Sequence, residues 1–96
     1  MRGSNEQTLK EAIDSLLKAY KLKDKLYEYR VVSGWENVMG KAVAKRTTEI
    51  YIKNRTLFVR LNSAPLKAEF SYAKSKIVAM LNEAVEYSVI DEVVLL

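Results

Sequence analysis

The stretch Thr47–Asn62 alternates apolar and polar side chains in two successive runs. Alternation with a period of two is typical of β-strands whose two faces meet different surroundings. Between the runs lies the polar break Lys53-Asn54-Arg55, and asparagine readily adopts the left-handed conformation of a tight turn. The stretch therefore predicts a β-hairpin, and its aliphatic face requires a covering layer. The residues of that face are Ile50, Ile52, Leu57, Val59 and Leu61.

The opposite face of the predicted hairpin carries Tyr51, Phe58 and Arg60. Two aromatic rings beside an arginine form a surface on which nucleic-acid bases can stack, provided that the face is open to solvent. The alternative, which the sequence favours, is that an amphipathic N-terminal helix covers the face, because such helices need an apolar surface to pack against. Tyr51 and Phe58 are therefore candidate base-stacking residues only if the face is uncovered.

Apolar residues at helical spacing predict two helices before the hairpin. The first covers residues 6–20, and a break is expected at Tyr20–Asp24. The second covers residues 25–44. Gly34 and Gly40 lie within it, at points where a kink or a helix end is expected.

A third helix and a third strand are predicted after the hairpin. Ser63 is the expected N-cap of the helix, and Pro65 lies in the first turn, where its missing N–H costs nothing. The segment Ser88–Leu96 is rich in β-branched residues and predicts a strand beside the hairpin. The apolar face of the third helix should pack on the aliphatic face of the hairpin. That helix face comprises Leu66, Phe70, Ala73, Ile77, Leu81 and Ala84.

These elements predict an α+β fold in the order α-α-β-β-α-β, with a three-stranded sheet packed against helices in two layers. The chain has 96 residues, which suffices for a single domain over residues 1–96. Trp35, the one tryptophan, lies on the apolar stripe of the second helix. We interpret it as a core anchor rather than a partner contact, because a buried tryptophan contributes strongly to a small core.

The composition excludes several kinds of chemistry. The chain contains no cysteine and no histidine, so zinc sites, iron–sulfur clusters, disulfides and histidine-based catalysis are excluded. We expect no enzyme, no cofactor and no metal site, and the lack of cysteine is compatible with a reducing cytoplasm. No run of 18 apolar residues is present, which predicts no membrane span. We interpret four acidic residues near the end of the chain as surface charge that could face a basic partner: Glu83, Glu86, Asp91 and Glu92.

Positive charge is concentrated around the hairpin. The formal net charge is +4, and residues 41–60 carry six basic groups against Glu49 alone. An uncompensated basic region favours an anionic partner such as nucleic acid, although a solvated face is the alternative. Lys53 and Arg55, beside the turn, are expected to be exposed, so replacing both should leave the melting temperature nearly unaltered. The candidate nucleic-acid-binding residues are Lys41, Lys45, Arg46, Lys53, Arg55, Arg60, Lys67 and Lys74, and Lys76 lies in the same basic cluster.

Several motifs together resemble one protein family. Trp35-x-x-Val38-Met39-Gly40 resembles the W-x-x-V-V-G signature of the DciA-like family, long catalogued as a domain of unknown function and often labelled RNA-binding or zinc-ribbon-like. The resemblance continues through Tyr51–Val59, which matches the family's hairpin, and through the third helix to Leu81-Asn82-Glu83. It covers residues 9–94.

The resemblance implies a KH-like domain and a role as a bacterial replicative-helicase loader. Family members associate with a DnaB-type helicase and bind single-stranded DNA. Met39 replaces the second valine of the signature, and no G-x-x-G loop is present, so the phosphate clamp of true KH domains is not carried over. We also expect this chain to lack the disordered basic tail of longer members, since nothing resembling it follows the last predicted strand.

The expected function is thus a non-enzymatic module that binds single-stranded DNA or RNA and contacts a replicative helicase. The expected state is a monomer or a weak homodimer. The alternative is a protein-interaction or dimerisation domain without nucleic-acid binding, in which the Tyr51 and Phe58 face or an edge strand pairs with another chain.

Overall fold

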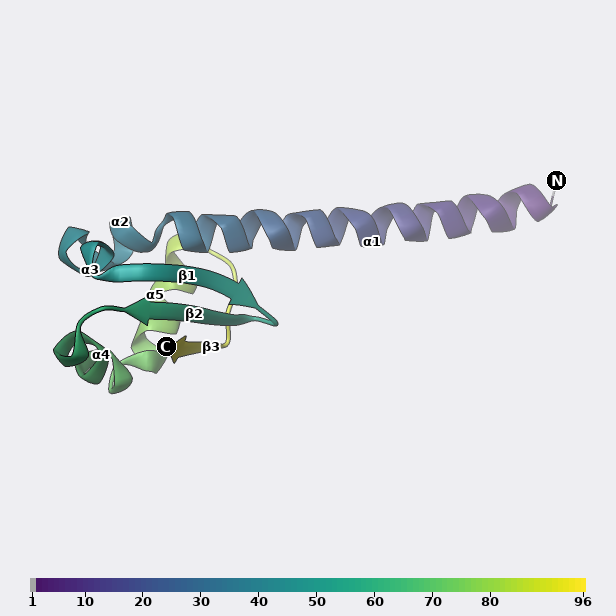
Figure 1. Ribbon diagram of the computed structural model, residues 1–96. Helices are drawn as coiled ribbons and strands as arrows, with labels where there is room; N and C mark the ends of the chain where they lie inside the picture. Colours follow the sequence, from purple (N-terminus) through teal and green to yellow (C-terminus); the bar gives the residue numbers. More distant parts are fainter. Residues whose placement is uncertain (1) are drawn as a thin grey trace.

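A computed structural model describes the backbone of residues 2–96 and the side chains from residue 8 onward. A small α+β body carries one long helix that projects beyond it (Figure 1). The α+β class and the predicted order of helices and strands are confirmed, although the helix boundaries differ. The elements are α1 (Arg2–Ser33), α2 (Trp35–Met39), α3 (Lys41–Lys45), β1 (Thr47–Lys53), β2 (Thr56–Leu61), α4 (Ala64–Ser71), α5 (Lys74–Val85) and β3 (Glu92–Leu95).

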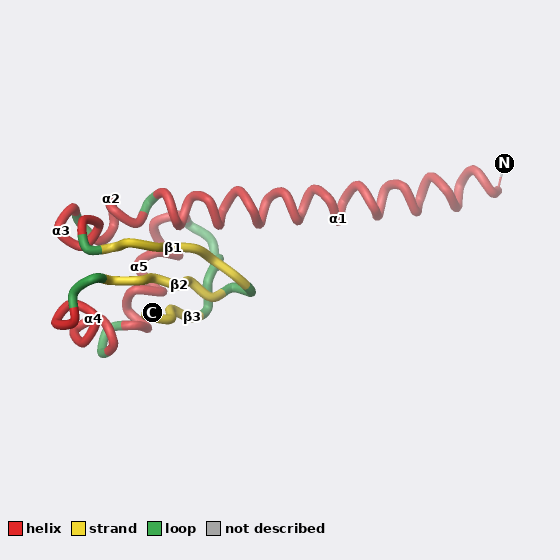
Figure 2. The backbone as a smooth tube through the Cα atoms, viewed as in Figure 1, coloured by secondary structure: helices red, strands yellow, loops and turns green. Residues whose placement is uncertain are grey.

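The predicted hairpin is confirmed. β1 and β2 pair antiparallel, with Tyr51 opposite Phe58, and β3 lies parallel to β2 on its other side, so the strand order is β1-β2-β3 (Figure 2). The turn is shorter than the sequence indicated, because only Asn54 and Arg55 lie between the strands. Both have positive φ, 51° and 59°, which matches the right-handed twist of a two-residue hairpin.

The core lies between the sheet and α5. The aliphatic residues of β2 are the most deeply buried, since Leu57 and Val59 have no exposed surface. Ile77 and Leu81 of α5 and Phe70 of α4 belong to the same cluster, and Leu66, Ile50 and Ile52 pack against it half-buried. The predicted packing of the third helical segment on the hairpin is therefore confirmed.

Trp35 is 3% exposed, which confirms its assignment to the core. Its ring meets Phe70 edge-to-face, with 6.5 Å between centroids. The indole Nε1–H donates to Thr47 Oγ1 at 3.0 Å, and that hydroxyl donates to the carbonyl of Val43 at 2.8 Å. One side chain thus ties α2, α3 and β1 together and leaves no polar atom of the indole unpaired.

The predicted break at Tyr20–Asp24 is wrong. α1 passes through this segment without interruption. The segment Tyr20–Asp24 contains neither glycine nor proline, and its residues are compatible with a helix. The interruptions come instead at the two glycines within the predicted second helix. Gly40 has φ 94°, a conformation that residues with a Cβ rarely adopt, and Gly34 comes so close to the preceding turn that a Cβ would lie 2.9 Å from the carbonyl oxygen of Arg30.

The predicted third helix is two helices. Its N-cap is confirmed, because Ser63 Oγ accepts a hydrogen bond from the amide of Leu66 at 3.3 Å. The amides of Tyr72 and Ala73 bond to carbonyls three residues earlier, in a tight turn that follows α4. α5 begins after this turn, at Lys74. The apolar stripe stays in phase across this turn, which is why periodicity alone did not show it.

α1 projects as a single rod, and the whole chain extends over 67 × 21 × 20 Å. No helix in the described part of the chain combines the length and the apolar character that crossing a membrane requires.

The packing predicts the effect of shortening Phe70. Phe70→Ala should lower the free energy of unfolding by about 3–5 kcal/mol, because it leaves a cavity beside Trp35. Urea denaturation followed by tryptophan fluorescence measures this. Tyr72→Ala is the matched control, since Tyr72 is 93% exposed and its loss should change stability by less than about 0.5 kcal/mol. An unchanged midpoint for Phe70→Ala would contradict the packing.

Candidate nucleic-acid interface

The sheet face turned away from α5 is open. Of the described helices, none crosses it, and α1 runs alongside β1 instead (Figure 1). The last turns of α1 are engaged elsewhere, since Val31 is buried in the core. The expectation that an N-terminal helix covers the Tyr51 and Phe58 face is therefore wrong.

Tyr51 and Phe58 lie directly opposite each other on this open face. Their rings stack with 4.9 Å between centroids and an interplanar angle of 12°, and Tyr51 is 39% exposed. Val94 of β3 pairs with Phe58 on the next strand and is half-buried. The three side chains form an apolar strip across all three strands, and the two rings lie nearly face to face.

Arg60 lies on the same face but is already engaged. Its Nε donates to Glu49 Oε2 at 3.0 Å, and the two residues are cross-strand partners. Both side chains are about half exposed, so the pair contributes little to stability. Arg60 can therefore exchange this partner for another anion at small cost.

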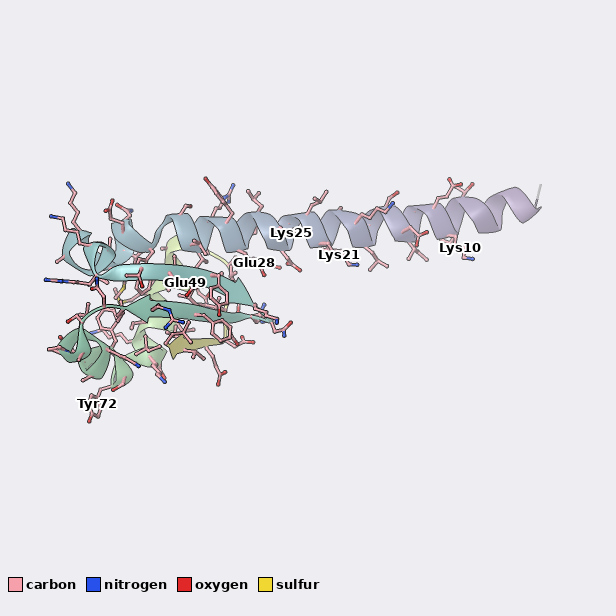
Figure 3. All side chains as sticks on the ribbon, in the orientation of Figure 1. Lys10, Lys21, Lys25, Glu28, Glu49 and Tyr72 are labelled. Atoms are coloured by element: carbon pink, nitrogen blue, oxygen red, sulfur yellow. The ribbon has the colours of Figure 1, made fainter. Side chains whose placement is uncertain are left out.

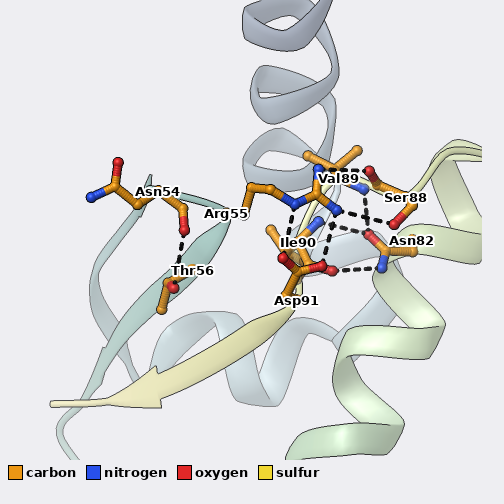
Figure 4. Close-up of polar contacts among 8 residues, drawn as sticks. All are labelled: Asn54, Arg55, Thr56, Asn82, Ser88, Val89, Ile90 and Asp91. Carbon is orange, nitrogen blue, oxygen red and sulfur yellow. Dashed lines mark hydrogen bonds and ion pairs between the residues drawn. The ribbon is translucent and has the colours of Figure 1, made fainter.

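Arg55 is held more firmly, by a network at the hairpin turn (Figure 4). Its Nε and Nη2 donate to the two carboxylate oxygens of Asp91 at 2.9 and 3.0 Å. Nη1 and Nη2 also donate to the carbonyl and the hydroxyl of Ser88, both at 3.1 Å. The turn is thereby tied to the segment before β3. Arg55 is exposed, as predicted, but its side chain is engaged in bonds that the sequence analysis did not foresee.

This network changes the acidity of both partners. Hydrogen bonds from Arg55 hold the pKa of Asp91 below its usual value, and the same bonds raise the pKa of Arg55. The basic partner of Asp91 is therefore Arg55 of the same chain. The four acidic residues near the end of the chain do not converge, since no group of three or more potential metal ligands occurs among the described residues.

Asn82 is a structural residue that the sequence analysis missed. Its Nδ2 donates to the carbonyl of Ile90 at 2.8 Å, and its Oδ1 accepts from the amides of Val89 and Ile90 at 2.9 and 3.1 Å (Figure 4). These bonds hold the segment before β3 against α5 where no regular pairing is available. The only signal in the sequence was its place in the Leu81-Asn82-Glu83 motif.

The structure places the candidate cations at several points around the sheet rather than in one strip. Lys41, Lys45 and Arg46 lie on α3 and at its end, before β1, whereas Lys53 lies beside the turn at the far end of β1. β1 has seven residues at about 3.3 Å each, so these two groups are roughly 20 Å apart. Lys67 lies on α4, and Lys74 begins α5.

All eight candidate cations are exposed. Within the described residues, Arg55 and Arg60 are the members of this set that form ion pairs. The remaining six, Lys41, Lys45, Arg46, Lys53, Lys67 and Lys74, are available to an external anion. Figure 3 shows the described side chains around the sheet and along the projecting helix.

The family model described as "Dna[CI] antecedent, DciA" matches residues 8–95. The chain belongs to the DciA family. Membership confirms the resemblance seen in the Trp35–Gly40 signature and the hairpin, and it indicates a helicase-loader role in DNA replication. Searches of curated proteins and of solved structures found no match to this DciA-family chain.

The Arg55 and Asp91 pair predicts a pH dependence of stability. Because the pKa of Asp91 is lowered in the folded state, its contribution is present above the usual aspartate pKa of about 4 and is lost as the pH falls through the lower folded-state value. Asp91→Asn should lower the melting temperature at pH 7 and reduce the further loss below pH 4. Thermal melts across this pH range measure both effects.

Glu92→Gln is the control for this prediction, because it removes a neighbouring exposed carboxylate that forms no ion pair among the described residues. It should melt like the parent at pH 7. Equal acid sensitivity of the parent and Asp91→Asn would contradict the assignment.

Proposed function

We propose that this DciA-family chain is a non-enzymatic module that binds single-stranded DNA on its open sheet face. The observation that carries the proposal is the stacked pair of Tyr51 and Phe58 on the open sheet face, in which Tyr51 is 39% exposed and Phe58 is half-buried. Aromatic side chains on an open sheet provide stacking energy for successive bases without selecting a sequence.

The six cations without an ion pair supply the electrostatic part of the proposal. Lys41, Lys45 and Arg46 lie at one end of β1 and Lys53 at the other, so a strand laid across the rings meets positive charge on both sides. Phosphates carry no direct sequence information, so the contact should tolerate different sequences. Single-stranded RNA offers the same phosphates and bases, and competition between the two measures any preference.

Binding of a labelled oligothymidine, followed by fluorescence anisotropy over a salt series, tests the two parts separately. Tyr51→Ala with Phe58→Ala should weaken binding by at least about 10-fold, because stacking is worth roughly 1–3 kcal/mol per base. The slope of log K against log salt should not change, since no phosphate contact is lost. The triple variant Lys41→Gln, Lys45→Gln, Arg46→Gln should also weaken binding, and it should flatten the slope by about 2.

The matched control removes the same charge from the projecting helix. Lys10→Gln, Lys18→Gln, Lys21→Gln changes three exposed lysines of α1, and Figure 3 shows Lys10 and Lys21 away from the sheet. It should keep most of the affinity and the slope of the parent. Equal losses of affinity in both triple variants would mean that the basic region is only a solvated face. Failure of the parent protein to bind the oligothymidine at low salt would overturn the proposal.

We further propose that the chain contacts a DnaB-type replicative helicase, which the family membership supports. The purified chain should co-elute with the replicative helicase of its source organism in size-exclusion chromatography. The Tyr51→Ala, Phe58→Ala variant should co-elute equally, because the sheet face is assigned to DNA. Separate elution at micromolar concentrations of both proteins would contradict the helicase contact.

A protein-interaction domain remains the second candidate function. The observation that favours it is the series of apolar side chains exposed along α1, which neither the sheet nor α5 covers. This candidate is compatible with DNA binding, because the two surfaces are separate.

A further inference from the structure

A groove runs between α1 and the free edge of β1, beside the open sheet face. Its volume is about 430 Å³, which is the size of pockets that hold small organic ligands. Tyr51 belongs both to this groove and to the open face, so the two surfaces are continuous. The groove is lined by Lys25, Tyr29 and Val32 of α1 and by Ile50, Tyr51 and Ile52 of β1.

The ring of Tyr51 has one face available, and that face looks into the groove. Phe58 stacks on the other face, with 4.9 Å between the ring centroids and an interplanar angle of 12°. Neighbouring strands lie about 4.8 Å apart, so two rings stacked at this distance stand upright on the sheet. The remaining face of Tyr51 therefore points away from β2, across the free edge of β1 and toward α1.

The wall formed by α1 supplies a second ring and a cation. Tyr29 lines the groove and is 68% exposed. Lys25 lies one helical turn earlier, is exposed, and forms no ion pair among the described residues. Lys25 and Glu28 lie on the part of α1 that runs past the hairpin (Figure 3). The half-buried carboxylate of Glu28 repels phosphate but accepts hydrogen bonds, so a phosphate fits the groove only near Lys25.

The edge of β1 adds backbone hydrogen-bonding groups to the groove. Lys53 and Thr56 close the two-residue turn, and bonded and non-bonded pairs alternate from there along the antiparallel strands. The N–H and C=O groups of Ile50 and Ile52 consequently point away from β2, on the side where α1 runs. Such donors and acceptors can bond to the edge of an unstacked base.

We infer that this groove binds one nucleotide of the single strand. The base stacks on the free face of Tyr51 and contacts the ring of Tyr29, and its phosphate lies at Lys25. The inference rests on the proposed DNA binding and specifies where a base is held. Both rings and the lysine are exposed before binding, so the groove needs no rearrangement to accept the nucleotide.

The observations favour a nucleotide over a peptide strand in this groove. A peptide that adds a strand bonds to a regular sheet edge over several residues. The register of β1 is broken between Thr47 and Glu49, so the regular part of its free edge offers the outward groups of Ile50 and Ile52. Two aromatic rings and a lysine without an ion pair match a base and its phosphate instead.

Anisotropy of a labelled oligothymidine tests the groove separately from the rest of the sheet face. Tyr29→Ala should weaken binding at least about 5-fold, because it removes one of the two rings that contact the base. The slope of log K against log salt should not change in this variant. Lys25→Gln should weaken binding and flatten the slope by about 0.7, because one phosphate contact of a single strand is lost.

Tyr20→Ala and Lys10→Gln are the matched controls on the same helix. Tyr20 is 55% exposed and lies on the opposite side of α1 from Tyr29. Lys10 lies far from the sheet (Figure 3). Both controls should bind the oligothymidine like the parent. All four variants change exposed side chains, so each should retain the cooperative unfolding of the body that Trp35 fluorescence reports.

A photocross-link locates the base directly. An oligothymidine that carries one iododeoxyuridine should cross-link to Tyr51 or Tyr29, as identified by mass spectrometry of tryptic peptides. Parental affinity in Tyr29→Ala, or cross-links only outside the groove, would overturn the inference, leave the proposed DNA binding in place and make a peptide strand the occupant to test. A parent that does not bind at low salt would instead overturn the proposed DNA binding, and this inference with it.

Discussion

The packing of β2 is the constraint on which the rest of the structure depends. This central strand pairs antiparallel with β1 and parallel with β3, and its inward residues Leu57 and Val59 are fully buried. A parallel neighbour requires a crossover, which α4 and α5 provide while they cover the inner face. Because side chains alternate along a strand, burying Leu57 and Val59 also fixes Phe58 and Arg60 on the outer face.

The polar contacts divide into those that hold the fold and those that remain free for a partner. Arg55 and Asn82 secure the irregular segment before β3, where backbone groups would otherwise lack partners. Arg60 has a weak, exposed partner in Glu49. The cations on α3 and around the sheet have no such partner among the described residues, which is why the proposed function gives them to an external anion. Similar residue types in the same basic region thus have different roles.

The projecting helix gives the molecule an exposed apolar surface that is separate from the outer sheet face. The body leaves its outer sheet face open, while the exposed apolar side chains of α1 extend past the body and are not covered by it. The same helix face has two uses along its length, since it packs inside the core at Val31 and faces solvent at Leu16. The apolar pattern along this face is continuous, and only the position of the body divides it.

The sequence by itself determined the hairpin, the α+β class, the burial of Trp35, the Ser63 cap and the membership of the DciA family. These follow from local patterns of side chains, which hold wherever the segment lies. Tertiary structure decided that α1 is unbroken, that the outer sheet face is open, and that Arg55 pairs with Asp91, 36 positions further along the chain. An amphipathic pattern states that a face needs a partner but not which surface supplies it. Only the packed chain decides that, because the contacts in question join residues far apart in sequence.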